Sequence, residues 1–155
     1  MLIEITKSPI DEAAARRMVE APDCGAVLVF WGVVRNHHAG KEVTHIDYHC
    51  YREMAEKELR AVATEAASAH GLERLAVVHR IGEVRVGEAS LLVVAASPHR
   101  RPAFDGVLAL VDALKERVPI WKKEYGSGGS HWVEGVLPGL DSGGEPDTPP
   151  EIVPG

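Results

Sequence analysis

The chain has 155 residues, of which 45% are hydrophobic and 26% are charged, and its formal net charge is −6. A chain of this length and composition is expected to form one globular domain whose core needs no disulfide or metal to hold it together. The acidic balance argues against a general nucleic-acid-binding protein, which would present a basic surface.

Strand patterns open the chain and recur after each helix. The stretch 25–35, GAVLVFWGVVR, is apolar almost throughout, which is typical of a strand covered on both faces. Gly32 within it permits a bulge or the close approach of another group. Further strands are expected at 2–6, at 42–51 after the polar loop NHHAGK, at two or three places within 75–97, and at 120–125 and 131–136 around the loop GSGGS.

Three helices are predicted between these strands. The first begins at Ser8 as its cap, with a proline and two acidic residues in its first turn. The second runs from about 52 to 70, with apolar residues at spacings of three and four and Gly71 as its stop. The third spans about 101–117 and must end near Pro119. Strands interleaved with helices and hairpin signals predict an α+β fold.

The composition changes at Leu137. The 19 residues 137–155 contain five prolines, four glycines and four acidic residues, and they contain no basic residue. Such a segment buries too little apolar surface to offset the entropy of ordering it. We therefore predict one domain over 1–136 followed by a flexible acidic tail over 137–155.

Cysteine usage and the N-terminal sequence indicate a compartment. Cys24 and Cys50 stand apart from any CxxC spacing, which favours a reducing cytoplasm over a disulfide scaffold. The first twenty residues mix acidic with apolar side chains, unlike a signal peptide, and no apolar run approaches the roughly 18 residues of a membrane span. We expect a cytoplasmic protein that binds neither membrane nor nucleic acid.

Lys115 continues an apolar line along the third helix. It follows Phe104, Leu108 and Val111 at spacings of four and three, so these side chains lie above one another. A lysine in this position either extends to solvent at the rim of the domain or lines a pocket. The spacing does not decide between these two interpretations of Lys115.

Two further basic groups stand at strand ends. The stretch SPHRRP places His99, Arg100 and Arg101 at a helix N-terminus, where free N–H groups and the helix dipole attract anions; a solvated basic turn is the alternative. Arg35 closes the apolar strand, where most arginines are simply solvated. If folding gathers these groups with Lys115, the site would select an anion and stabilise negative charge that develops during a reaction. A lysine there would serve as a general acid or base.

The hexapeptide PIWKKE (119–124) combines strand alternation with two adjacent ammonium groups. Side chains alternate between the faces of a strand, so only one of the two lysines shares a face with Ile120 and Glu124. Alternation alone does not decide whether Lys122 or Lys123 faces a site.

Four histidines that lie close in the sequence raise the question of a metal site. His37, His38, His45 and His49 lie close in sequence, and the last two share a strand face with Asp47. No cysteine or spaced pair completes a familiar zinc pattern, and no nucleotide-binding fingerprint is present. We therefore predict no metal and no other cofactor.

Four motifs occur in order within residues 24–135. They are FxGxVRN from Phe30, HRxGxxxxGE from His79, SxHR from Ser97 and LKxxxPxWKxE from Leu114. Together with their spacing, they resemble the catalytic (large) subunit family of molybdopterin synthase. The resemblance implies an α/β hammerhead domain with an additional small antiparallel sheet, which agrees with the α+β prediction.

The same resemblance implies a sulfurtransferase of molybdenum cofactor biosynthesis. It would convert cyclic pyranopterin monophosphate (precursor Z) to molybdopterin by inserting the two sulfurs of the dithiolene. The sulfur would come from a small ubiquitin-like carrier whose C-terminal Gly-Gly thiocarboxylate enters the pocket. Family members form a homodimer with one carrier at each end, a heterotetramer whose pockets draw residues from both chains.

Carried over by motif, the resemblance implies a set of site residues and selects Lys122 over Lys123 for catalysis. The implied catalytic residues are Lys115 and Lys122, and the implied substrate-binding residues are Val33, Val34, Arg35, His99, Arg100, Lys115, Lys122, Lys123 and Glu124. Two rival readings are a non-catalytic module that binds a phosphorylated ligand or a ubiquitin-like partner, and a different phosphate-ester enzyme that needs no sulfur carrier.

Overall fold

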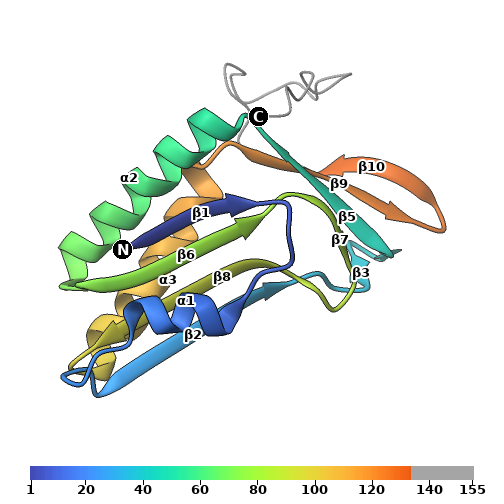
Figure 1. Cartoon of the computed structure of the whole chain (residues 1–155). Helices are drawn as coiled ribbons and strands as arrows, with labels where there is room; N and C mark the ends of the chain where they lie inside the picture. Colours follow the sequence, from blue (N-terminus) through green and yellow to red (C-terminus); the bar gives the residue numbers. More distant parts are fainter. Residues whose placement is uncertain (134–155) are drawn as a thin grey trace.

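The computed structural model describes residues 1–133, which form two four-stranded sheets, a two-stranded sheet and three helices (Figure 1). This arrangement confirms the predicted α+β fold. The elements are β1 (Leu2–Thr6), α1 (Glu12–Val19), β2 (Ala26–Val33), β3 (His37–His38), β4 (Lys41–Glu42), β5 (His45–Cys50), α2 (Arg52–His70), β6 (Arg74–Arg80), β7 (Gly82–Arg85), β8 (Ala89–Ser97), α3 (Arg100–Arg117), β9 (Ile120–Gly126) and β10 (Gly129–Val133).

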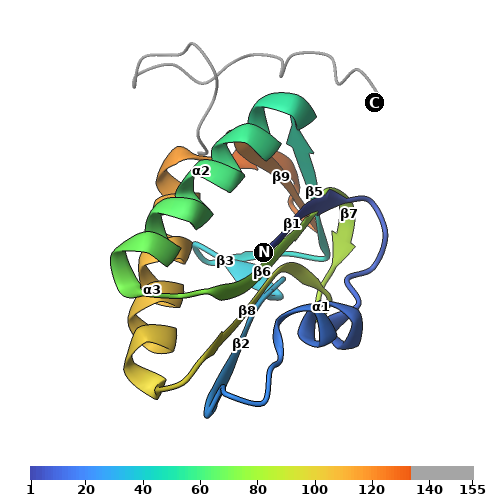
Figure 2. The ribbon, with the colours of Figure 1, turned by 60° about the vertical axis from the view of Figure 1, so that its left-hand side comes forward.

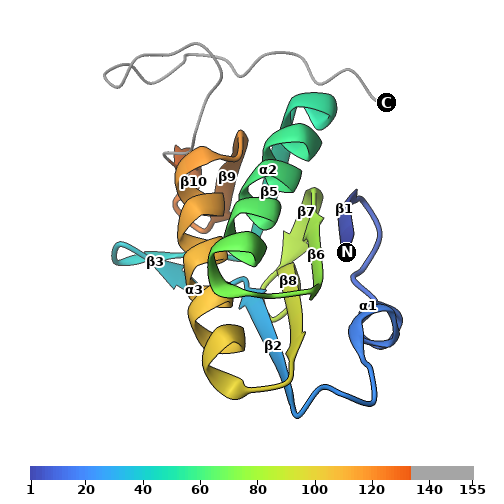
Figure 3. The same cartoon turned by 90° about the vertical axis from the view of Figure 1, so that its left-hand side faces the viewer.

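The first sheet has the strand order β1-β6-β8-β2 and is parallel only between β1 and β6. Its central strands are apolar on both faces, so alternate residues feed two cores. Leu75 and Val93 belong to the core beneath α2 and α3, whereas Ala76 and Val94 belong to the core beneath α1. Figure 3 shows the sheet between α1 on one side and the α2–α3 pair on the other.

The second sheet has the order β10-β9-β5-β7 and is antiparallel throughout. It extends from the end of the first sheet, beyond the helices (Figures 1 and 2). A smaller cluster of Val34, Val43, Ile46 and Val84 packs where the chain passes from one sheet to the other. The β3–β4 hairpin stands beside this junction, so the second sheet, the end of β2 and the end of α3 meet at one place.

The two long helices agree with the sequence prediction. Helix α2 spans 52–70, and Gly71 closes it in the left-handed conformation with φ of 69°. Helix α3 begins one residue earlier than predicted and ends before Pro119, whose ring cannot continue it. None of the helices within residues 1–133 is long and apolar enough to cross a membrane.

Two local predictions are wrong. Helix α1 starts at Glu12 rather than after Ser8, because the Asp11 carboxylate accepts the Ala14 N–H at 3.0 Å and caps it. The loop NHHAGK contains the β3–β4 hairpin. Strand β2 lies at the edge of the first sheet, but its alternating side chains from Leu28 to Trp31 pack against both cores, as predicted. The predicted tail and residues 134–136 lie outside the described residues.

Candidate functional site

A cavity of about 380 Å³ lies where β2, α3 and the second sheet meet. Its lining includes residues from the end of β2, the C-terminal turn of α3, strand β9 and the β3–β4 hairpin. Six of the residues predicted from the sequence border it: Val33, Val34, Arg35, Lys115, Lys122 and Glu124. The fold thus brings together basic groups that are up to 87 positions apart in the sequence, from Arg35 to Lys122.

The irregular end of β2 turns Arg35 into the cavity. The β2–β8 register shifts between Gly32 and Val33, as the glycine in the predicted strand suggested. A Cβ at position 32 would lie 3.1 Å from the Leu91 Cβ, so the strand passes close to β8 there. The backbone of Val34 then exchanges hydrogen bonds with the Gly87–Glu88 turn, which fixes the chain just before Arg35.

Lys115 lies in the last turn of α3, and an ion-pair cluster anchors this end of the helix. Arg117 pairs with Glu58 at 2.7 Å and also with Glu65, both on α2. The hydrogen bond from Arg117 lowers the pKa of the Glu65 carboxyl below its ordinary value. Of the two readings of Lys115, the structure favours the second, because the side chain borders the cavity.

Strand β9 resolves the choice between the adjacent lysines. Ile120, Lys122 and Glu124 line the cavity, as alternation requires for one strand face. Lys123 points to the opposite face, where its Nζ lies 5.2 Å from the centre of the Trp132 ring and 5.6 Å from that of Tyr125. The structure therefore puts Lys122 inside the cavity of this chain and Lys123 outside it.

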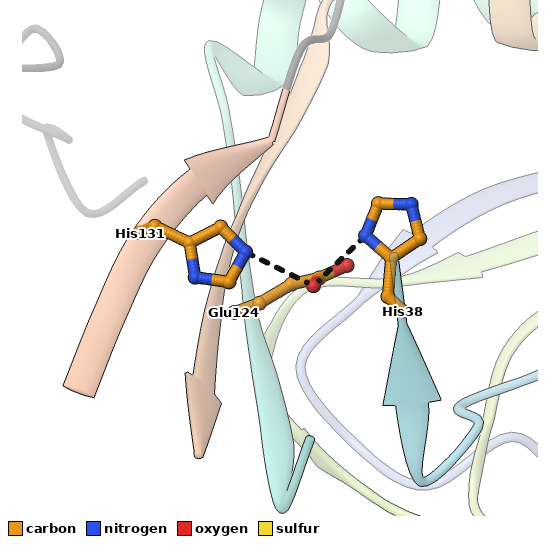
Figure 4. Close-up of side chains that lie close together, drawn as sticks. All are labelled: His38, Glu124 and His131. Carbon is orange, nitrogen blue, oxygen red and sulfur yellow. Dashed lines mark hydrogen bonds and ion pairs between the residues drawn. The ribbon is translucent and has the colours of Figure 1, made fainter. Parts of the chain in front are cut away.

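Glu124 is the buried acidic centre of the cavity wall. It is 1% exposed, and Oε1 lies 3.6 Å from the Lys122 Nζ. Oε2 lies 3.1 Å from the His38 Nδ1 and 3.4 Å from the His131 Nε2 (Figure 4). A buried carboxylate needs such partners, since an unpaired one would be very costly.

Sequence reasoning missed this grouping of Glu124 with two histidines. His131 was not singled out, although it lies directly opposite Glu124 in the β9–β10 ladder. The register would have shown the pair if the turn of that hairpin had been placed correctly. His49, one of the histidines considered for a metal, instead lies 3.2 Å from the Asp47 carboxylate, and both neighbour Trp121 and Lys123 across the β5–β9 ladder.

Two titratable side chains in the cavity wall are held neutral. His79 is buried at 6% exposure, and burial lowers its pKa to about 4. Its Nδ1 donates a hydrogen bond to the Arg80 carbonyl oxygen at 2.9 Å. Burial also raises the pKa of the Tyr48 phenol above its ordinary value. The arginine and lysine side chains that border the cavity are Arg35, Lys115 and Lys122.

His99 and Arg100 are not brought to this cavity within one chain. They stand at the N-terminal end of α3, fifteen residues before Lys115 in the case of Arg100, which is roughly 22 Å along the helix. Both side chains are exposed. The cavity of a single chain thus gathers Arg35, Lys115 and Lys122 but does not include His99 and Arg100.

Comparison with known proteins gives a consistent result. The family model described as MoaE protein matches residues 5–117. Molybdopterin synthase catalytic subunit 1 of Mycobacterium tuberculosis is 36% identical over 129 residues, which cover 83% of this chain and 88% of that protein. The molybdopterin synthase catalytic subunit of Pyrococcus abyssi is 38% identical over 137 residues, with 86% and 91% coverage.

Solved structures agree with these relatives. The crystal structure of molybdopterin synthase from Staphylococcus aureus matches with a TM-score of 0.81 and 34% identity, covering 85% of this chain and 96% of that one. A complex of subunits 1 and 2 of molybdopterin-converting factor from Helicobacter pylori matches with a TM-score of 0.64 over 84% and 89% of the chains. At 21% identity, the second likeness speaks for the fold alone.

Proposed function

The chain belongs to the MoaE family, whose relatives are named molybdopterin synthase catalytic subunits, and from this we propose that its cavity converts cyclic pyranopterin monophosphate to molybdopterin. It is an enzyme subunit with a role in molybdenum cofactor biosynthesis. The observation that carries the proposal is the meeting of Arg35, Lys115 and Lys122 in one cavity. A volume of about 380 Å³ suits a small-molecule ligand.

The reactants in this proposal are both anions. Arg35 anchors the cyclic phosphate, since a guanidinium group matches phosphate oxygens with paired donors. Lys122 orients the thiocarboxylate at the C-terminal Gly-Gly of a small ubiquitin-like sulfur carrier. Its distance of 3.6 Å from Glu124 keeps the ammonium group at the cavity wall rather than in solvent.

Lys115 is the proposed catalytic acid or base. The thiocarboxylate sulfur attacks a carbon of the pterin side chain; a C–S bond forms as the C–O bond at that carbon breaks, the oxygen leaves as water or stays on the opened phosphate, and carrier and substrate are joined by a thioester. Water then cleaves the thioester, so the sulfur remains on the pterin and the carrier leaves with a carboxylate. Proton transfer by Lys115 and charge stabilisation by Lys122 assist these steps, which occur twice to complete the dithiolene. Val33, Val34 and Glu124 shape the wall against which the substrate lies.

A homodimer would supply the two residues that a single chain leaves outside the cavity. Arg100, Phe104, Leu108, Val111 and Lys115 follow one line along α3, and the phenylalanine and leucine are 58% and 64% exposed. Exposed apolar side chains of this size are typical of an interface. Residues 100 and 115 lie symmetrically about the middle of this line. A two-fold axis there would pack two α3 helices antiparallel and set Arg100 of one copy beside Lys115 of the other.

Carrier binding and location complete the proposal. Two carriers on such a dimer make a heterotetramer, and β10, which among the described strands pairs only with β9, offers a strand edge near the cavity for a carrier chain to approach. The described cysteines, Cys24 and Cys50, are both free, which favours the reducing cytoplasm.

The direct test replaces Lys115 by alanine and measures molybdopterin formation from the pterin monophosphate and thiocarboxylated carrier. Because Lys115 is exposed, the variant is expected to fold normally and to lose turnover by about 100-fold or more. Lys57→Ala, an exposed lysine on α2, is the matched control and should keep full turnover. Near-normal turnover of folded Lys115→Ala would remove this lysine from the mechanism.

Omitting the carrier separates the two rival functions. A binding module would hold the pterin without converting it under either condition, and a different phosphate-ester enzyme would turn over without the carrier. The proposed sulfurtransferase forms product only when the thiocarboxylated carrier is present. Turnover in its absence would contradict the proposal.

A further inference from the structure

The three side chains in Figure 4 converge from elements that are distant in the sequence. His38 belongs to β3, Glu124 to β9 and His131 to β10, and one ligand atom from each lies within 4.8 Å of the others. We propose that these three residues bind a divalent transition-metal ion of the Zn²⁺ class. Two imidazoles and a carboxylate are a common ligand set for catalytic or open zinc sites.

The distances fit a tetrahedral ion. Two ligands about 2.05 Å from a tetrahedral Zn²⁺ lie about 3.3 Å apart. The Glu124 Oε2 lies 3.1 Å from the His38 Nδ1 and 3.4 Å from the His131 Nε2. The His38 and His131 nitrogens lie within 4.8 Å of each other, so a shift of at most about 1.5 Å between them is needed to admit the ion.

The ligands are also held in place and can be reached. The Glu124 side chain is 2% exposed, while those of His38 and His131 are 37% and 36% exposed. The β9–β10 ladder fixes Glu124 opposite His131, so two of the three ligands are positioned by backbone pairing. A buried carboxylate beneath two accessible imidazoles attracts a cation from solvent without unfolding the site.

The ligand types select the class of metal. Imidazole nitrogens suit Zn²⁺, Ni²⁺, Cu²⁺ and Co²⁺, whereas Mg²⁺ and Ca²⁺ prefer sites built from oxygen. Lys122 lies 3.6 Å from the other carboxylate oxygen, Oε1, so an ion on Oε2 would compete with it for the charge of Glu124. Binding of the metal would therefore weaken the ion pair between Glu124 and Lys122.

The ion would leave one coordination position open. His38 and Glu124 also line the cavity, so this position is reached from the cavity side. A soft sulfur ligand, such as a thiocarboxylate or a dithiolene, is expected to occupy it. This last step alone rests on the proposed function; binding of the ion itself does not.

The ion would also join two hairpins. His38 lies on β3–β4, and the other two ligands lie on β9–β10, so one ion connects the edge of the cavity to its wall. Because metal binding to the folded state stabilises it, the melting temperature should rise when the ion is added.

The test uses the full chain, stripped with a chelator, and Zn²⁺ alone as the probe. Calorimetric titration should give one ion per chain, and Co²⁺ in its place should give the strong visible absorption of a tetrahedral site. His131→Ala should weaken binding by at least about tenfold, and Glu124→Gln should do the same where it folds. Since His131 is partly exposed, its variant is expected to fold, which circular dichroism checks.

His37→Ala is the matched control. This exposed histidine precedes His38, but it lies beside Asn36, with Nδ1 2.8 Å from the amide oxygen. Its loss should leave the affinity for Zn²⁺ unchanged. The proposal is overturned if the stripped chain takes up less than one ion, or if His131→Ala binds as tightly as the parent chain. Because no substrate or carrier is present, either result leaves the sulfurtransferase proposal untouched.

Discussion

The two ends of α3 carry basic residues in opposite settings. At the C-terminal end, Lys115 borders a cavity together with Lys122 and Arg35, and an ion-pair cluster around Arg117 fixes the helix to α2. At the N-terminal end, the side chains of His99 and Arg100 are exposed, roughly 22 Å away along the helix.

A single chain therefore forms a cavity around the basic residue at the C-terminal end of α3 but leaves the basic residues at its N-terminal end exposed. Both ends belong to motifs of the same family resemblance, yet only the C-terminal end borders the cavity described above. The exposed line through Phe104 and Leu108 runs between them, which is the arrangement expected if a second copy brings the distant end to the cavity. Sequence motifs identify functional residues, whereas the site that each one serves depends on packing between chains as well as within them.

The largest effect on turnover is expected in the cavity at the C-terminal end of α3. The adjacent lysines of β9 provide a matched variant and control there. Lys122→Ala should lower molybdopterin formation by about 100-fold or more, because it removes charge that stabilises the reacting thiocarboxylate. Lys123→Ala should lower it by no more than about threefold, since the side chain lies over Trp132 on the other face. Turnover of both purified variants with charged carrier measures the contrast. Equal losses would mean that the faces of β9 do not divide the roles.

The sequence predicted elements better than it predicted contacts. Helix α2 and helix α3 were found to within one residue, because their periodicity and their glycine and proline stops are local signals. The start of α1 was misplaced because Ser8 and Asp11 are equally good caps and only the fold decides between them.

The residues of the cavity could be predicted only in part, because many of their contacts depend on the fold and not on local sequence signals. Motifs pointed to Lys115 and Lys122, but the pairing of Glu124 with His38 and His131 depends on strand register and on a hairpin that crosses from another part of the chain. The register of β9 against β10 cannot be predicted from the loop GSGGS, because its several glycines allow more than one turn and the rest of the fold selects among them.

A complementation experiment addresses the distant end of α3. Arg100→Ala alone should lower turnover by about tenfold, the loss expected for one charge-assisted contact to an anion. Mixing it with Lys115→Ala, after dissociation and reassociation, gives mixed dimers in which one site holds both changes and the other holds neither. If the sites are shared between chains, random mixing should restore about a quarter of the parent turnover.

The same mixture discriminates the alternative. If each cavity used only its own chain, both sites of a mixed dimer would be defective, and mixing would restore nothing. Size-exclusion chromatography with Phe104→Ser provides the structural check, since loss of an exposed interface side chain should shift the chain toward monomer. A monomeric parent chain would contradict shared sites directly.

The smallest predicted effect is on stability and comes from the buried His79 in the cavity wall. His79 has a pKa of about 4 in the folded protein, below the ordinary value of 6.5 expected for the unfolded chain. The unfolded state therefore binds more protons between these values, so stability is unaffected above about pH 6.5 and is lost as the pH falls toward 4. The expected loss is about 2 kcal/mol near pH 5.

His79→Asn tests this assignment, because asparagine keeps an N–H donor for the Arg80 carbonyl oxygen and does not titrate. Urea unfolding of both proteins from pH 7.5 to 5 should show a smaller decline in the free energy of unfolding for the variant, by about 2 kcal/mol at the acid end. The comparison of slopes cancels the other histidines, which are common to both proteins. If the free energy of unfolding falls equally with pH in both proteins, the buried imidazole of His79 does not cause the loss of stability in acid.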